Sequence, residues 1–183
     1  MHEVVEAHEA HGAHGGSEDD PLVIRVAVTM AILAVLVALA TLLGHRAHTE
    51  EVLLEAKAND QWAYYQAKNS RSHEMEGVAD MLGTFVTADK EKAAKLQEKY
   101  NKQAARYEHE KEEAGEKAQE FEKEKDLVSH RADRFDGAEV LLEIGLIVCS
   151  LTLLTRNRLY WFSGIVLGVL GVVVAVTGFL VRS

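Results

Sequence analysis

The chain has 183 residues, one proline, one cysteine and a formal net charge of -9 at pH 7. Its apolar residues gather into three long runs, which is the distribution of a membrane protein rather than of a globular domain with one core. Lys and Arg are interleaved with Asp and Glu, which argues against a nucleic-acid-binding face, and the lone Cys149 excludes an internal disulfide.

Residues 1–20 form a polar tail with no secretory signal, and we expect it to be disordered. His8, His11 and His14 recur every three residues and could bind zinc, nickel or copper. The alternative is a solvated tail, which we favour because the neighbouring glycines provide no rigid site. Metal binding at these histidines is therefore a hypothesis about the tail alone.

The first predicted transmembrane helix covers residues 21–43. Asp20 followed by Pro21 is typical of a helix start, with the acid as N-cap and proline at the first helical position. The following run of about 20 apolar residues is long enough to cross a bilayer. Arg25 lies within one turn of its end, where its side chain can reach the headgroups.

Residues 44–137 are predicted to form an extramembrane, antiparallel, coiled-coil hairpin of two helices. The first arm should end at a cap near Gly83, and the second should start near Ala88 with Thr87 as N-cap, so the turn lies near residues 83–88. Two patterns support this prediction. The first arm has a helical pattern with one mostly apolar side, and in the second arm an apolar or aromatic residue recurs at every seventh position up to Leu142. These residues are Leu54, Ala58, Tyr65, Ser72, Met75, Ala79 and Leu82, and then Ala93, Tyr100, Tyr107, Ala114, Phe121, Val128 and Phe135.

The second predicted span, residues 138–155, carries two carboxylates on one helix face, Glu139 and Glu143. They could form a proton or cation site. Alternatively, they could belong to a charge network near the membrane boundary, called the membrane neck here, in which the basic residues after the first span neutralise the two carboxylates. Those basic residues are His45, Arg46 and His48.

The third predicted span, residues 159–181, follows a short basic loop. Small residues recur along it in alternating steps of four and three, which favours close packing against another helix of the same or another subunit. These residues are Gly164, Gly168, Gly171, Ala175 and Gly178.

The first arm contains two distinctive stretches, His45-Arg46-Ala47-His48-Thr49-Glu50-Glu51 and Lys57-Ala58-Asn59-Asp60-Gln61-Trp62-Ala63-Tyr64-Tyr65-Gln66-Ala67-Lys68. They resemble an uncharacterised family of bacterial membrane proteins that is described only as a domain of unknown function. The resemblance covers most of the chain from the first span onward and implies a bacterial inner-membrane protein with a central helical region. It implies no activity.

Aromatic residues of both arms form a predicted interaction surface, since rigid aromatic rings are good anchors at interfaces. The alternative is that they only fill space between the arms. The residues are Trp62, Tyr64, Tyr65, Tyr100, Tyr107, Phe121 and Phe135.

The sequence thus predicts an all-α membrane protein with three transmembrane helices. We expect a homo-oligomeric scaffold or accessory subunit of a larger complex, with the lipid bilayer as partner and no cofactor. It contains no recognisable catalytic motif, so we expect no enzyme. An oligomeric channel using the glycine seam or Glu143, and a metal sensor using the tail, are the alternatives. The bias of Lys and Arg places the hairpin and the C-terminus on the cytoplasmic side.

Overall fold

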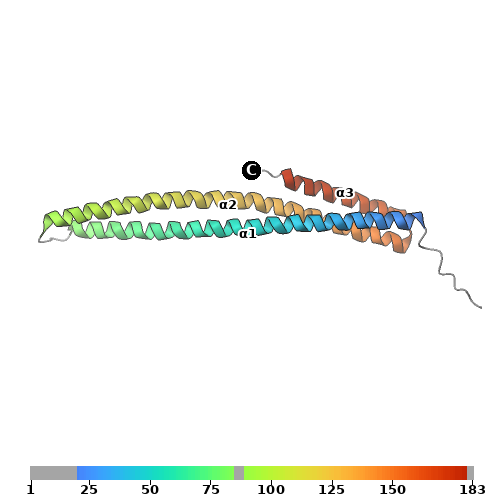
Figure 1. The fold of residues 1–183 in the computed structure, drawn as a ribbon, viewed down its shortest axis with the longest axis horizontal. Helices are drawn as coiled ribbons and strands as arrows, with labels where there is room; N and C mark the ends of the chain where they lie inside the picture. Colours follow the sequence, from blue (N-terminus) through green and yellow to red (C-terminus); the bar gives the residue numbers. More distant parts are fainter. Residues whose placement is uncertain (1–19, 85–88, 181–183) are drawn as a thin grey trace, which may run out of the picture. The chain divides into compact units, whose positions relative to one another are not determined.

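A computed structural model describes residues 20–84 and 89–180 (Figure 1). Within these residues all regular secondary structure is helical, in the order α1 (Pro21–Thr84), α2 (Lys90–Thr155) and α3 (Arg158–Leu180). The predicted all-helical class is therefore confirmed for this part of the chain, and each of the three helices is long and apolar enough to cross a membrane. His8, His11, His14 and Thr87 lie outside the described residues.

Aspartate caps begin the two long helices. The Oδ1 atom of Asp20 accepts a hydrogen bond of 2.9 Å from the Leu22 amide, as predicted for a helix with Pro21 at its first position. Asp89 does the same for the amide of Lys92 at 3.0 Å. Asp89 is thus the N-cap of α2, and the helix starts at Lys90 rather than near Ala88.

The helix ends differ from one another in their chemistry. The prediction that Gly83 caps α1 is wrong, because α1 continues to Thr84 and no described glycine has a positive φ. The end of the flexible Gln97 side chain lies 2.8 Å from where a Cβ atom of Gly83 would stand. Between α2 and α3, Arg156 adopts a left-handed conformation with φ of 53°, and its amide donates to the Thr152 carbonyl at 2.8 Å.

The described residues divide into two compact units. Unit 1 contains residues 20–41 and 136–175, and unit 2 contains residues 42–84, 89–135 and 176–180. All three helices contribute to unit 1, and each contains a segment long and apolar enough to cross a membrane. Helix α2 has no break at Gly137. The core of unit 1 contains the buried residues Leu33, Ala40, Leu142 and Cys149.

In unit 2, contacts between α1 and α2 follow one order along the chain. Glu50 contacts Arg131 at 3.2 Å, the indole N–H of Trp62 donates to Glu122 at 2.9 Å, and the hydroxyl of Ser72 donates to the Ala104 carbonyl at 3.1 Å. The partner's number falls as the α1 number rises. Most residues buried between the two helices are small, namely Ala47, Ala58, Ser72, Ala79, Ala104, Ala114, Ala118 and Ala132.

Candidate functional site

The middle of unit 2 holds two partly buried lysines at positions where an apolar core residue would be expected. The ammonium group of Lys68 lies 2.5 Å from a carboxylate oxygen of Glu110. It also lies 4.8 Å from the ring centre of Tyr64 and 5.1 Å from that of Tyr107. Lys68 thus combines one ion pair between the two helices with two cation–π contacts.

Lys111 lies in a related environment on α2, but its ion pair is within that helix. Its ammonium group pairs with Glu108, donates to the side-chain oxygen of Asn69 at 3.2 Å, and lies 5.7 Å from the ring centre of Tyr65. Only 13% of the Lys111 side chain is exposed, so its aliphatic stem is part of the packing. The eight residues around the two lysines are called the lysine–tyrosine layer here: Tyr64, Tyr65, Lys68, Asn69, Tyr107, Glu108, Glu110 and Lys111.

Ion pairing shifts the pKa values of the charged groups in this layer. The hydrogen bond with Glu110 raises the pKa of Lys68, and Tyr64 adds to this effect. The same bond with Lys68 lowers the pKa of Glu110. Both partners are therefore held in their charged forms over a wider pH range than free side chains would be.

Next to this layer, Trp62 and Tyr65 form an edge-to-face pair with ring centres 5.5 Å apart. Gly115 is buried beneath Tyr65, and a Cβ atom on Gly115 would lie 3.3 Å from the tyrosine ring. The glycine therefore makes room for the ring. On the next turns, the Lys57 ammonium group lies 5.6 Å from the ring centre of Phe121.

The predicted interaction surface is thus distributed over different environments. Tyr64 is 47% exposed, while Phe135 is only 2% exposed and packs edge to face on Phe179 with ring centres 5.2 Å apart. The other members are partly buried: Trp62, Tyr65, Tyr100, Tyr107 and Phe121. Whether any of them binds a partner stays a prediction.

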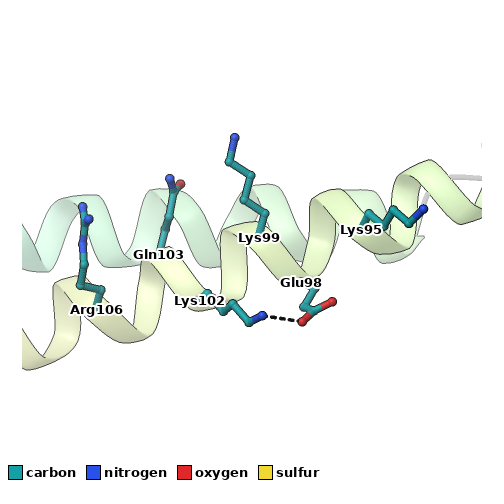
Figure 2. Close-up of a pocket in the computed structure, with 6 residues that line it drawn as sticks. All are labelled: Lys95, Glu98, Lys99, Lys102, Gln103 and Arg106. Carbon is teal, nitrogen blue, oxygen red and sulfur yellow. Dashed lines mark ion pairs between the residues drawn. The ribbon is translucent and has the colours of Figure 1, made fainter.

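Two hollows open on the surface of unit 2. One, of about 380 Å³, lies beside the lysine–tyrosine layer and is lined by residues of both helices, among them Asp60, Glu113 and Lys117. The other, of about 480 Å³, is lined by α2 alone and is mostly basic (Figure 2). Within the described residues, no group of three or more His, Cys, Asp or Glu side chains is placed to hold a metal ion.

In unit 1, the predicted glycine seam of α3 lies against the other two helices of the same chain. A Cβ atom on Gly171 would lie 2.8 Å from Cγ of Leu142, and one on Gly168 would lie 2.5 Å from Cδ2 of Leu33. Gly164 faces Cys149 on α2 in the same way. These three glycines permit close helix packing within the subunit. Gly178 belongs to unit 2, where a Cβ atom would lie 3.2 Å from the Phe135 ring.

One face of unit 1 combines small residues with carboxylates. The hydroxyl of Thr41 donates to a carboxylate oxygen of Glu139 at 2.7 Å, and Glu143 is exposed one turn further along α2. On α1, small residues recur in steps of four and three, and all of them are exposed: Ala27, Ala31, Ala34, Ala38 and Thr41. We call this row the alanine seam. Its spacing is visible in the sequence, but only the glycine seam of α3 was predicted.

The basic residues of the predicted neck belong to unit 2. His48 lies 3.3 Å from Glu51, three residues further along α1, and His45 and Arg46 are exposed. The neck as a whole joins residues of both units and stays a prediction.

The described chain is thus an all-helical protein whose three helices each carry a segment with the length and composition of a membrane span. Residues 22–181 match the family described as Domain of unknown function (DUF4337), and the chain belongs to this family. No curated protein and no solved structure matches the chain.

Proposed function

We propose that this protein is a homo-oligomeric membrane scaffold, or an accessory subunit of a larger membrane complex, that acts through an antiparallel helical hairpin. Unit 1 is the membrane anchor in this proposal, with one segment of each helix crossing the bilayer. The long parts of α1 and α2 in unit 2 form the hairpin. The bias of Lys and Arg near the spans favours a cytoplasmic hairpin in a bacterial inner membrane.

The observation that carries the proposal is the face formed by the alanine seam and Glu143. Glu143 precedes the end of α2 at Thr155 by 12 residues, or about 18 Å at 1.5 Å per residue. With Thr155 at one boundary, that depth falls inside a hydrocarbon layer about 30 Å thick. A carboxylate there is costly when it faces lipid, and small residues permit close approach of another helix. A second copy that covers this face satisfies both features.

The hairpin supports the same conclusion from the water-exposed side. Its two helices meet through small residues, so large apolar side chains remain at the surface. Val52, Leu53 and Met81 are each more than half exposed. A two-helix layer has no third element to cover such residues, and assembly would cover them.

An oligomeric channel is the second candidate, and Glu143 is the feature that favours it. The glycine seam does not add support, because Gly164, Gly168 and Gly171 face helices of their own chain rather than open space. A pore would therefore have to form at the alanine seam. The metal-sensor hypothesis rests on His8, His11 and His14 and has no support from the described residues.

Oligomerisation can be tested by mass measurement in mild detergents and in lipid nanodiscs. We expect more than one copy per particle, and we expect the double variant Ala31→Leu with Ala38→Leu to reduce that number. Val28→Leu with Val35→Leu is the matched control, because both valines are more than half exposed on another face of α1. A wild-type protein that is monomeric in all these conditions, with no partner bound, overturns the proposal.

The hairpin itself can be tested by a disulfide. Ser72→Cys with Ala104→Cys should form an intrachain bond in a Cys149→Ser background, because the Ser72 hydroxyl contacts the Ala104 carbonyl. Disulfides that form only between subunits would contradict the hairpin.

A further inference from the structure

An exposed side of α2 carries one continuous row of charged residues in alternating steps of three and four. We call this row the outer stripe. It consists of Lys92, Lys95, Lys99, Lys102, Arg106, His109, Glu113, Glu116 and Glu120, and all nine are exposed. Five basic residues come first, and three acidic residues follow His109. Figure 2 shows four of the basic residues along α2.

This separation of charge is unfavourable for an isolated helix. Residues three or four positions apart are neighbours on the helix surface, so the stripe places Lys95 beside Lys99 and Glu116 beside Glu120. The basic residues also lie nearer the N-terminal end of α2, where the helix dipole favours acids. Ion pairs within α2 offset part of this cost, but they do not require the cations to gather in one half of the stripe and the anions in the other.

Neighbouring side chains neutralise the stripe only in part. Lys95 pairs with Glu91 at 2.7 Å and Lys102 with Glu98 at 2.6 Å, both within α2. Lys99, Glu116 and Glu120 have no ion pair among the described residues. Arg106 pairs with Glu110 and His109 lies 3.6 Å from Glu113, so the unpaired charges among the described residues are two cations in the basic half, Lys92 and Lys99, and two anions in the acidic half.

We propose that the outer stripe binds the outer stripe of a second copy of this chain in antiparallel orientation. In one register, three lysines meet three glutamates at once: Lys95 opposite Glu120, Lys99 opposite Glu116, and Lys102 opposite Glu113. The two residue numbers in each pair add up to the same value. This is required when two antiparallel helices rise by the same distance per residue. A two-fold axis between Arg106 and His109 repeats the three pairs, so the surface is self-complementary.

Other occupants fit the stripe less well. A parallel second copy would place lysine over lysine and glutamate over glutamate. A nucleic acid or another polyanion would be attracted by the basic half and repelled by the acidic half. The match is also limited in length, because Lys92 would face Lys123 at the edge of the paired region. The partner that fits the stripe is therefore an antiparallel copy.

The inference goes beyond the proposed function. Because α2 is one continuous helix from Lys90 to Thr155, antiparallel outer stripes put residues 138–155 of the two copies at opposite ends of the pair, about 90 Å apart, so the stripe would join copies anchored in two facing membranes and not the neighbours that meet at the alanine seam.

The inference can be tested with two charge-reversal variants of the full chain in mild detergent. One carries Lys95→Glu, Lys99→Glu and Lys102→Glu, and the other carries Glu113→Lys, Glu116→Lys and Glu120→Lys. We expect each variant alone to associate at least about tenfold more weakly than the wild type, because like charges then face each other. An equimolar mixture should associate at least as strongly as the wild type.

The matched control reverses Glu91→Lys and Glu98→Lys. It breaks the same pairs within α2 but leaves the outer stripe unchanged, so wild-type association is expected. Far-ultraviolet circular dichroism shows whether each variant is helical, and recovery in the mixture shows that both variants are folded. Association through the stripe should also weaken with added salt, since the Debye length is about 10 Å at 0.1 M and shorter above that.

Cross-linking tests the orientation in a Cys149→Ser background. A single cysteine at position 109 should link to its own counterpart, because these positions are only about 5 Å apart along the axis of the pair. Cysteines at position 95 should be about 37 Å apart and should link only to a cysteine at position 120 of the other copy.

The outcomes separate this inference from the proposed function. A wild-type protein that is monomeric throughout overturns both. An oligomer that is unaffected by the charge reversals, that is not restored in the mixture, or that links at position 95 to itself overturns the antiparallel stripe alone. Loss in each variant, recovery in the mixture and links between positions 95 and 120 support it.

Discussion

Replacing the glycines of unit 1 by alanine one at a time tests how α3 packs. Each replacement has two opposing effects, a gain in helix stability and a loss from overpacking, and their balance differs from one position to another. Alanine stabilises a helix interior by about 1 kcal/mol relative to glycine. At Gly171, however, the added methyl group would lie 2.8 Å from Cγ of Leu142 and 3.1 Å from the backbone oxygen of Ala138. The leucine can move, but the backbone carbonyl cannot move without shifting α2.

The expected magnitudes follow from these distances. Overpacking a tight site costs about 1–3 kcal/mol, so Gly171→Ala should destabilise unit 1 by up to about 2 kcal/mol after the helix gain is subtracted. Gly164→Ala should cost at least as much, because its methyl group would lie 2.7 Å from the Gly145 carbonyl oxygen. Gly137→Ala is the control in unit 1, since its nearest neighbour, Val174, would be 3.9 Å away. It should be neutral or stabilising by up to about 1 kcal/mol.

Tryptophan fluorescence can report on each unit separately during denaturation in mixed micelles. Trp161 lies in unit 1, where its indole N–H donates to the Thr29 hydroxyl at 3.1 Å, and Trp62 lies in unit 2. A Trp62→Phe background therefore leaves one reporter for unit 1. If Gly171→Ala and Gly164→Ala stabilise unit 1 as much as Gly137→Ala does, the close packing of α3 through its glycines is refuted.

Further predictions concern unit 2. Phe135→Ala should cost about 3–5 kcal/mol because the ring is buried on Phe179, whereas Phe121→Ala should cost less because its ring is only partly buried; thermal melting followed by circular dichroism compares them. The lowered pKa of Glu110 means that its pairing with Lys68 stabilises the fold above the ordinary value of 4.5 and is lost as the pH falls below it. Melting temperatures should therefore fall less steeply on acidification for Glu110→Gln than for the wild type, and equal slopes would contradict this contribution.

Periodicity was sufficient to predict the all-helical class because it follows directly from helix geometry. A core position recurs about every 3.5 residues, so the seven-residue stripe identified Ala114, Val128 and Phe135, all of which are buried. The cap at Asp20 was equally predictable, since aspartate is favoured at the N-cap and proline at the first helical position. Gly83 was misassigned because a glycine near a helix end does not always cap it, and the sequence does not show that α1 continues to Thr84.

The lysine–tyrosine layer was harder to predict, since lysine at a core position is normally a reason to reject a core assignment. The opposite helix supplies an acid and an aromatic ring to Lys68, and it supplies an amide and an aromatic ring to Lys111, whose acid lies on α2 itself. The partners on the opposite helix are about 40 residues or more away in the chain. Gly115 was missed for the same reason, as its role depends on a tyrosine of α1. Such polar layers become visible only when the register of the two helices is known.

The outer stripe is not apparent from the composition of the chain, because its charges separate only when each residue is assigned to a helix face. Averaged over the chain, basic and acidic residues alternate, and no basic face is expected. Sorted by helix face, the same residues separate, with Lys99 among cations and Glu116 among anions. The neighbouring residues that carry the opposite charge, such as Glu98, lie on other faces of α2 and produce the apparent alternation. Charge patterning in a long helix is therefore informative only after each residue is assigned to a face, and on its outer face α2 has the pattern of a surface that complements itself when reversed.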